Sequence, residues 1–345
     1  MNRNQKLGLA TVVALILSVL SFISSQHRGE RFERGQKFLP NLNPDEIVEA
    51  TITKGDQVTQ LKRVGDEFTL VSSNGYPAKN EAVNRFIRDV LGLSLEKQVG
   101  RGDDMDQELQ LTTEFDESMR VQFKNAAGKQ MVDFVIGKSL EGGNGSYIKR
   151  MDGDARNVYL TSSRAYLTAG DDGFLRKELL NVAQTEVQRI RGAGYTIEDQ
   201  EGTLKLVGLP DGKKESPAVG QLKTALTNLS FDKVYLADDA QVANLSFTQR
   251  VTYDLKDQSH YTLELAKSGD KTYLRISGEH DLRSINPSEL ETDEQVKEKS
   301  EQWEAAVKIQ EFTAFHGSWV YELSEYVGKK FLATAAELME DEEKS

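Results

Sequence analysis

The sequence predicts an α+β protein in which a single N-terminal transmembrane helix precedes two similar domains and C-terminal helices. Three observations predict this class. Residues 7–25 form a run without charged side chains, and residues 47–285 contain two series of segments in which apolar and polar residues alternate. The last part of the chain is rich in charged residues and places apolar residues at helical spacing. Alternation is typical of half-buried strands, and a spacing of three to four residues is typical of amphipathic helices.

The first element is the apolar run at residues 7–25, which follows Arg3 and Lys6. At a rise of about 1.5 Å per residue it spans about 28 Å, which matches the hydrocarbon core of a bilayer. A cleaved signal peptide is the alternative, but residues 22–26 form a poor cleavage site. We therefore expect residues 1–25 to comprise a cytoplasmic tip and a transmembrane helix. The apolar side chains of this anchor are Leu7, Leu9, Val12, Val13, Leu15, Ile16, Leu17, Val19, Leu20, Phe22 and Ile23.

The expected localisation is the bacterial inner membrane, crossed once, with the large C-terminal part in the periplasm. Basic residues on the two sides of the apolar run are nearly balanced, so charge counting does not fix the topology. The orientation rests instead on the length of the chain that follows the run. Residues 26–46 are polar, contain two prolines, and are predicted to form a stalk.

The first α+β domain is predicted over residues 47–182. Alternation at 47–54, 58–64 and 67–71 indicates a three-stranded meander, and apolar residues at helical spacing indicate a helix over residues 80–92. Further strands are predicted at 109–113, 118–124, 130–136, 146–150 and 157–160, and short helices at 163–167 and 174–180.

The second domain is predicted over residues 183–285 and starts the same order again. Strands are predicted at 186–191, 195–199, 203–207, 251–255, 261–266 and 272–277, with a helix that buries Val219, Leu222, Leu226 and Leu229. The order meander, helix, meander therefore occurs twice, which indicates an internal duplication. Two unrelated α+β domains are the alternative.

Residues 286–345 are predicted to be a helical segment. Asn286-Pro287-Ser288 is a helix start signal, and Val296, Trp303 and Val307 are expected on the buried stripe of that helix. A second helix is predicted from residue 319 onward. The aromatic residues of this segment belong either to the core or to a surface that binds a partner, and the partner-surface candidates are Trp303, Trp319, Tyr321 and Tyr326.

Composition excludes several classes of function. The chain has 55 acidic and 43 basic residues, a net charge of −12 and no cysteine. The acidic balance argues against nucleic acid as a partner, because neutralising phosphates requires clustered Lys and Arg. Without cysteine there are no disulfides, thiolate metal sites or cysteine nucleophiles. The four histidines are scattered through the sequence and match no ligand pattern.

No motif identifies an enzyme, a cofactor or a metal site. Gly137-Lys138-Ser139 resembles the end of a phosphate-binding loop, but Val132 stands where that motif requires its first glycine. The carboxylates of Asp103, Asp104 and Asp106 match no calcium-binding loop and are expected in solvated turns. A hydrolase that uses these three carboxylates remains one hypothesis, which requires two of them to face each other across a cleft.

Several short segments carry a resemblance to a known family. They are Leu61-Lys62-Arg63, Phe68-Thr69-Leu70, Tyr76-Pro77-Ala78, Gly137-Lys138, Tyr147-Ile148 and Val158-Tyr159-Leu160. With these segments the chain resembles a bacterial family, domain of unknown function 4340. Members of the family usually have Trp in the third strand, where this chain has Phe68. The resemblance covers most of residues 47–335 and implies an N-terminal membrane helix with an α+β extracytoplasmic part. It gives no catalytic residues.

The resemblance also implies a function, because members of the family are often associated with ABC transporters of the gliding-motility auxiliary type. We therefore expect a non-enzymatic, membrane-anchored periplasmic accessory subunit of an ABC transporter complex, acting in export or cell-envelope maintenance. Its expected partners are the permease, the ATPase and the lipid bilayer, which it meets through one helix. An anchored solute- or glycan-binding module that works alone is the alternative.

Overall fold

The computed structural model describes residues 33–152, 156–282 and 292–342. The chain divides into two compact units. The first comprises residues up to Ser72 and Pro77–Phe174, and the second comprises Ser73–Tyr76 and Leu175 onward. Both units are built mainly from antiparallel β-sheet, with few helices. The predicted α+β class is therefore wrong for the described residues, because several segments expected to be helical are strands or irregular.

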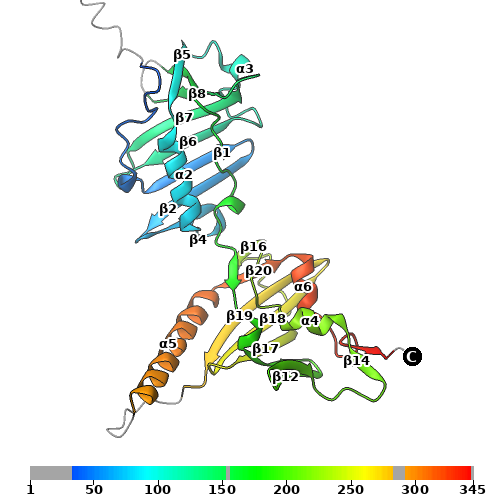
Figure 1. The fold of residues 1–345 in the computed structure, drawn as a ribbon. Helices are drawn as coiled ribbons and strands as arrows, with labels where there is room; N and C mark the ends of the chain where they lie inside the picture. Colours follow the sequence, from blue (N-terminus) through cyan, green and yellow to red (C-terminus); the bar gives the residue numbers. More distant parts are fainter. Residues whose placement is uncertain (1–32, 153–155, 283–291, 343–345) are drawn as a thin grey trace, which may run out of the picture. The chain divides into compact units, whose positions relative to one another are not determined.

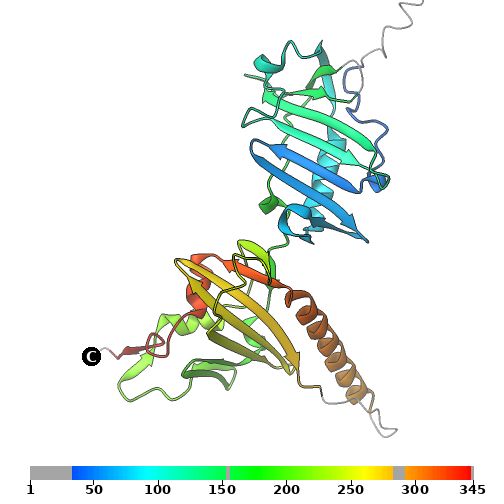
Figure 2. The same cartoon turned by 180° about the vertical axis from the view of Figure 1, so that it is seen from behind.

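The first unit contains a nine-stranded sheet with the order β4-β3-β2-β1-β6-β7-β8-β9-β5. Helix α2 crosses one face of this sheet (Figures 1 and 2). Phe86 of α2 packs edge-on against Phe123 of β6 and Phe174, so this face is the core face. The elements are β1 (Glu49–Lys54), β2 (Gln57–Val64), β3 (Glu67–Leu70), β4 (Tyr76–Pro77), α2 (Asn80–Gly92), β5 (Leu95–Arg101), α3 (Asp106–Leu109), β6 (Met119–Lys124), β7 (Gln130–Ser139), β8 (Ser146–Arg150) and β9 (Asn157–Thr161).

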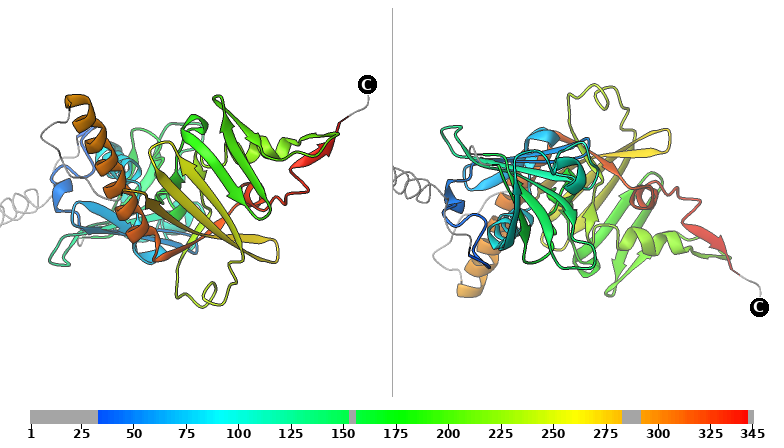
Figure 3. Two further views of the ribbon diagram at one scale, coloured as in Figure 1. Left: turned by 90° about the horizontal axis from the view of Figure 1, so that it is seen from below. Right: turned by 90° about the horizontal axis from the view of Figure 1, so that it is seen from above.

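The second unit contains an eight-stranded sheet with the order β13-β12-β11-β17-β18-β19-β20-β16. The short strands β10 and β15 pair separately, as do β14 and β21, which lie near the C-terminus in Figure 3. The elements are β10 (Glu178–Leu180), β11 (Val187–Gly192), β12 (Tyr195–Gln200), β13 (Thr203–Leu206), β14 (Lys213–Glu215), α4 (Pro217–Lys223), β15 (Leu229–Ser230), β16 (Lys233–Leu236), β17 (Gln249–Leu255), β18 (Ser259–Ser268), β19 (Lys271–His280), α5 (Asp293–His316), β20 (Trp319–Leu323), α6 (Glu325–Phe331) and β21 (Met339–Asp341).

The two large sheets have the same connectivity. In each unit a three-stranded meander leads to a helix and then to an edge strand, after which a second meander pairs back onto the first strand of the first meander. Residues at equivalent positions in the two units are apolar, and each is the same number of residues away from its counterpart. Examples are Leu61 with Ile197, Leu70 with Leu206, Val83 with Val219 and Val90 with Leu226, all of them buried. Helix α5, between β19 and β20, has no counterpart between β8 and β9.

The predicted second C-terminal helix is replaced at its start by a strand. Residues Trp319–Leu323 form β20, which is buried along its whole length and pairs with both β16 and β19. A strand covered on both faces reads as a continuous apolar run, which explains why spacing alone suggested a helix. Within the predicted first domain, residues 109–113 are not a strand, and residues 163–167 and 174–180 are not helices.

The predicted helix over residues 286–316 begins later than expected. Helix α5 starts at Asp293, where Thr292 and Gln295 form a reciprocal capping box. Its buried residues are Ile309 and His316, whereas Val296 and Trp303 are exposed. The predicted stripe is therefore wrong for Val296 and Trp303, whereas Val307 is partly buried. The start signal at residues 286–288 lies outside the described residues.

The predicted single-pass inner-membrane localisation is corrected by the described helices. Over residues 33–152, 156–282 and 292–342, none is both long and apolar enough to span a bilayer. Helix α5 has 24 residues but is rich in Asp, Glu and Lys. The apolar run at residues 7–25, on which the prediction rested, lies outside the described residues.

Candidate functional site

A groove of about 590 Å³ lies on the core face of the first sheet, beside the strands that α2 leaves uncovered. Val132 of β7 lines it and pairs with Phe123 of β6, which packs against α2, so helix and groove share one face. The floor also includes Arg150 of β8, Tyr159 of β9 and Leu95 of β5. Residues 36–42 form one wall, and the turn between β6 and β7 forms the other.

The wall at residues 36–42 is held by backbone hydrogen bonds to the start of β5. The amide of Gly35 donates to the carbonyl of Leu95 at 2.7 Å, and the amide of Leu95 donates to the carbonyl of Gln36 at 2.9 Å. Phe38 then turns inward, with its ring 5.2 Å from Phe134 and 6.3 Å from Tyr159. Part of the predicted stalk is therefore packed against the sheet and shapes the groove.

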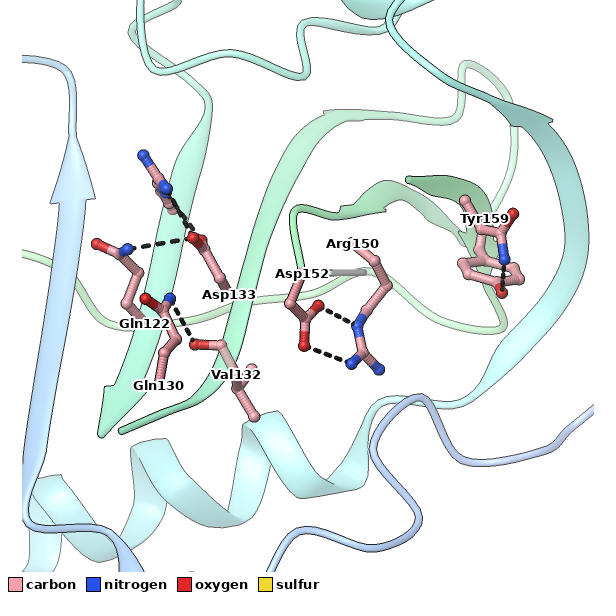
Figure 4. A network of polar contacts seen from close by, with 9 residues as sticks. Gln122, Gln130, Val132, Asp133, Arg150, Asp152 and Tyr159 are labelled. Carbon is pink, nitrogen blue, oxygen red and sulfur yellow. Dashed lines mark hydrogen bonds and ion pairs between the residues drawn. The ribbon is translucent and has the colours of Figure 1, made fainter. Parts of the chain in front are cut away.

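The groove combines an apolar floor with basic and amide side chains. Arg150 donates two hydrogen bonds to Asp152, at 2.5 and 2.6 Å (Figure 4), and its guanidinium lies 5.6 Å from the centre of the Phe38 ring. The Tyr159 hydroxyl accepts a hydrogen bond from Asn157 at 3.1 Å. The lining includes three cations, Lys37, Lys129 and Arg150, but one carboxylate, Glu46. Its remaining polar side chains are Gln36, Asn41, Asn125 and Gln130.

The opposite face of this sheet carries a separate polar network. Arg120 donates two hydrogen bonds to Asp133, at 2.8 and 2.6 Å, and Gln122 donates a third at 3.2 Å (Figure 4). The hydrogen bonds to Asp133 raise the pKa of Arg120. Asp133 is buried, and both of its carboxylate oxygens accept hydrogen bonds from β6, so the network holds β6 against β7.

The carboxylates of the hydrolase hypothesis lie in an ion-pair cluster. Lys149 of β8 is fully buried, and its Nζ lies 2.6 Å from Asp103 and 2.7 Å from Asp106. The hydrogen bonds from Lys149 and Arg156 lower the pKa of Asp103. A carboxylate held in its ionised form cannot act as a general acid at neutral pH, and here two carboxylates share one ammonium group instead of facing each other. Asp104 is exposed on the same loop.

Three of the four histidines are described, and each has a hydrogen-bonding partner. His260 lies between Asp254 and Asp281, at 2.9 Å from each, and His280 contacts the carbonyl of Asp257 at 2.8 Å. His316 contacts the hydroxyl of Tyr321 at 2.6 Å within the core. The fourth, His27, is outside the described residues. Across residues 33–152, 156–282 and 292–342 no group of three His, Asp or Glu side chains is arranged to hold a metal.

The four predicted partner-surface residues separate into two pairs. Trp319 and Tyr321 lie on β20 in the core of the second unit, where both rings contact Tyr76. They are part of the packing and not of a surface. Trp303 on α5 and Tyr326 on α6 are exposed by 56% and 68%. The groove itself was missed, because its lining comes from separate strands and loops that share no local sequence signal.

The comparisons with known proteins concern this same region. Residues 69–219 match the model of a family described as Domain of unknown function (DUF4340). The match begins in β3 and ends in α4, so it includes Leu95, Val132, Arg150 and Tyr159 of the groove but not the wall at residues 36–42. It is also shorter than the expected resemblance over residues 47–335. No curated protein and no solved structure matches the chain.

Proposed function

We propose that this chain, whose residues 69–219 match the DUF4340 family model, is a non-enzymatic accessory subunit of an ABC transporter complex and that it acts by binding other proteins. The transporter association is the one that the sequence resemblance implies. In this proposal the energy for transport comes from the ATPase, and this chain contributes a binding surface in export or envelope maintenance.

One observation carries the proposal: the first unit has an open groove lined by partly exposed apolar side chains next to basic ones. Its volume of about 590 Å³ is well within the range of about 300–1,000 Å³ that is usual for binding sites. Leu42 and Met131 are partly exposed and offer apolar contact above the buried Val132 and Leu95. Lys37 and Lys129 are exposed at the rim. Such a combination of apolar core and polar rim is typical of protein interfaces.

The proposal is tested by affinity purification of the full-length protein from its native cells in mild detergent. Mass spectrometry of the purified material is expected to find an ABC permease and its ATPase in stoichiometric amounts. Recovery of the protein alone, at several detergent strengths and after chemical crosslinking, contradicts the proposal. A purification with the tag on an unrelated protein of similar charge controls for non-specific retention.

A solute- or glycan-binding module is the second candidate, favoured by the amide and aromatic side chains of the same groove. Tyr159 offers a ring face, and Asn125 and Gln130 contribute amide groups of the kind that bind polar ligands. The Asn125 oxygen also accepts hydrogen bonds within its own turn, and the Gln130 nitrogen donates to the carbonyl of Val132. This candidate predicts that a saccharide or small solute raises the unfolding temperature of the purified protein and that Tyr159→Ala abolishes the increase. A screen in which no ligand stabilises the wild-type protein removes this candidate.

A further inference from the structure

The duplicated topology allows the groove of the first unit to be compared with the equivalent place in the second. Phe123 of β6 and Tyr253 of β17 correspond, because each contacts the helix of its unit and pairs with the first strand of the first meander. From these two residues the strand registers lead outward, one strand at a time, to the positions that line the groove.

The strand registers identify the equivalent position in the second unit for three residues of the groove floor. Val132 pairs with Phe123 as Tyr261 pairs with Tyr253, so Val132 and Tyr261 correspond. In the next ladder, Phe134 pairs with Arg150 and Leu263 pairs with Ile276, so Arg150 corresponds to Ile276. In the ladder after that, Ile148 pairs with Tyr159 and Leu274 pairs with Tyr321, so Tyr159 corresponds to Tyr321.

In the second unit, helix α5 covers these positions. Phe312 packs edge-on against Tyr261, with ring centres 5.3 Å apart, and the His316 ring contacts the hydroxyl of Tyr321 at 2.6 Å. Between them, the Thr313 hydroxyl exchanges hydrogen bonds with the backbone of Gly278, the neighbour of Ile276 along the same face. The C-terminal half of α5 therefore fills this place on the second sheet.

In the first unit, the same three positions line the groove, but the chain itself covers part of them. Val132 is 2% exposed, whereas Arg150 and Tyr159 are partly exposed although the Phe38 ring contacts both. We propose that the groove receives an acidic amphipathic helix of a partner protein, which packs there as α5 packs in the second unit. This inference rests on the proposed function, since it names the kind of segment by which the partner is bound. It follows from the intramolecular example, in which the same sheet positions bind a helix.

Charge indicates that the bound helix is acidic. The chain as a whole carries a net charge of −12, yet the groove presents Lys37 and Lys129 against Glu46. The third cation, Arg150, is paired with Asp152. Arg150 also replaces the apolar Ile276 of the second unit, so the groove contacts a polar flank where α5 meets an apolar surface. Complementary charge of this kind fixes orientation and speeds association. The expected segment has apolar residues at i, i+3 or i+4, and i+7, with Asp or Glu on the flank.

Site-specific photo-crosslinking in the full-length protein tests the inference. The photoreactive residue p-benzoylphenylalanine replaces Lys129 or Met131 at the groove, and Lys54, an exposed position at the end of β1, serves as the matched control. After irradiation in the native cells, mass spectrometry identifies the crosslinked peptide. We expect one partner segment that has the apolar spacing and an excess of acidic residues, captured at the groove positions and not at Lys54.

A charge variant adds a quantitative readout. Lys129→Glu is expected to reduce the crosslink from Met131 about five-fold, which is the effect of one exposed charge pair, while Lys54→Glu leaves it unchanged. Circular dichroism verifies that both variants fold. A crosslink to a second copy of this chain, to an extended or basic segment, or to no protein overturns the inference. If affinity purification still recovers the transporter subunits in that case, the proposed function stands and only the helix-binding groove is refuted.

Discussion

Replacement of the buried Lys149 by methionine is expected to destabilise the first unit strongly. Its ammonium group lies 2.6 Å from Asp103 and 2.7 Å from Asp106, and none of its side chain is exposed, whereas 15% of Asp106 is. Methionine keeps most of the stem and removes the charge, so Asp106 remains mostly buried without a cation. Breaking a buried pair in this way costs about 3–5 kcal/mol.

The two tryptophans of the chain make the assay specific. Both Trp303 and Trp319 belong to the second unit, so tryptophan fluorescence follows that unit, while far-UV circular dichroism follows both. For a urea dependence of about 2 kcal/mol per molar, Lys149→Met is expected to shift the circular dichroism transition of the first unit by about 1.5–2.5 M. The fluorescence transition is expected to stay where it is.

A second variant separates the ion pair from simple packing. Lys149→Met combined with Asp106→Leu removes both charges and is expected to recover most of the lost stability, because apolar replacement of a buried pair is often neutral. A cost below about 1 kcal/mol for the single variant, or no recovery in the double variant, refutes the reasoning. Either result shows that the cluster does not depend on charge compensation.

Three further predictions concern the cores of the units. Burial lowers the pKa of His316 to about 4, so the second unit should lose up to about 3 kcal/mol between pH 6.5 and 4, and His316→Gln should flatten this loss in fluorescence-monitored urea titrations. Gly137→Ala places a Cβ 2.1 Å from the Leu109 carbonyl oxygen and should cost about 1–3 kcal/mol by circular dichroism, unlike Gly92→Ala, which meets open space. Trp319→Ala should cost about 3–5 kcal/mol and Trp303→Ala less than about 0.5, and equal costs contradict their assigned burial.

His260 does not mask the acid effect predicted for His316. Burial acts to lower the pKa of His260, but the hydrogen bonds with Asp254 and Asp281 outweigh it and raise the pKa. Because the folded-state pKa is raised, its stabilising contribution is fully present below pH 6.5 and is lost only as pH rises through that pKa. Arg191 also contacts Asp254, and Glu279 lies opposite His260 on β19. His260→Gln should therefore lower the stability by a constant amount below pH 6.5 and change the slope of the pH profile only above that pH.

Local patterns in the sequence were sufficient for the meanders and for α2. Alternation located β1, β2 and β3 within a few residues, because one face of each strand is buried and the other is wet. The spacing of Val83, Phe86 and Val90 located α2 for the corresponding reason. In both cases the burial pattern of a segment follows from its own residues.

The failures lie where burial depends on distant parts of the chain. Residues 319–323 are a strand because β16 and β19 flank them on both sides, which no local spacing reveals. Val296 is exposed because the buried contacts of α5 lie in its second half, which the spacing of apolar residues does not reveal. The groove is formed by segments as distant in sequence as Lys37 and Tyr159, and its significance appears only when the register of one unit is compared with that of the other.

The most direct test of the central claim is quantitative co-purification of partner proteins with three full-length forms of the chain. These are the wild type, Lys129→Glu in the groove, and Lys54→Glu on the control surface. We predict that the wild type and Lys54→Glu retain the permease and ATPase equally, while Lys129→Glu retains about five-fold less. Equal retention by all three forms contradicts the assignment of the groove as the partner-binding site.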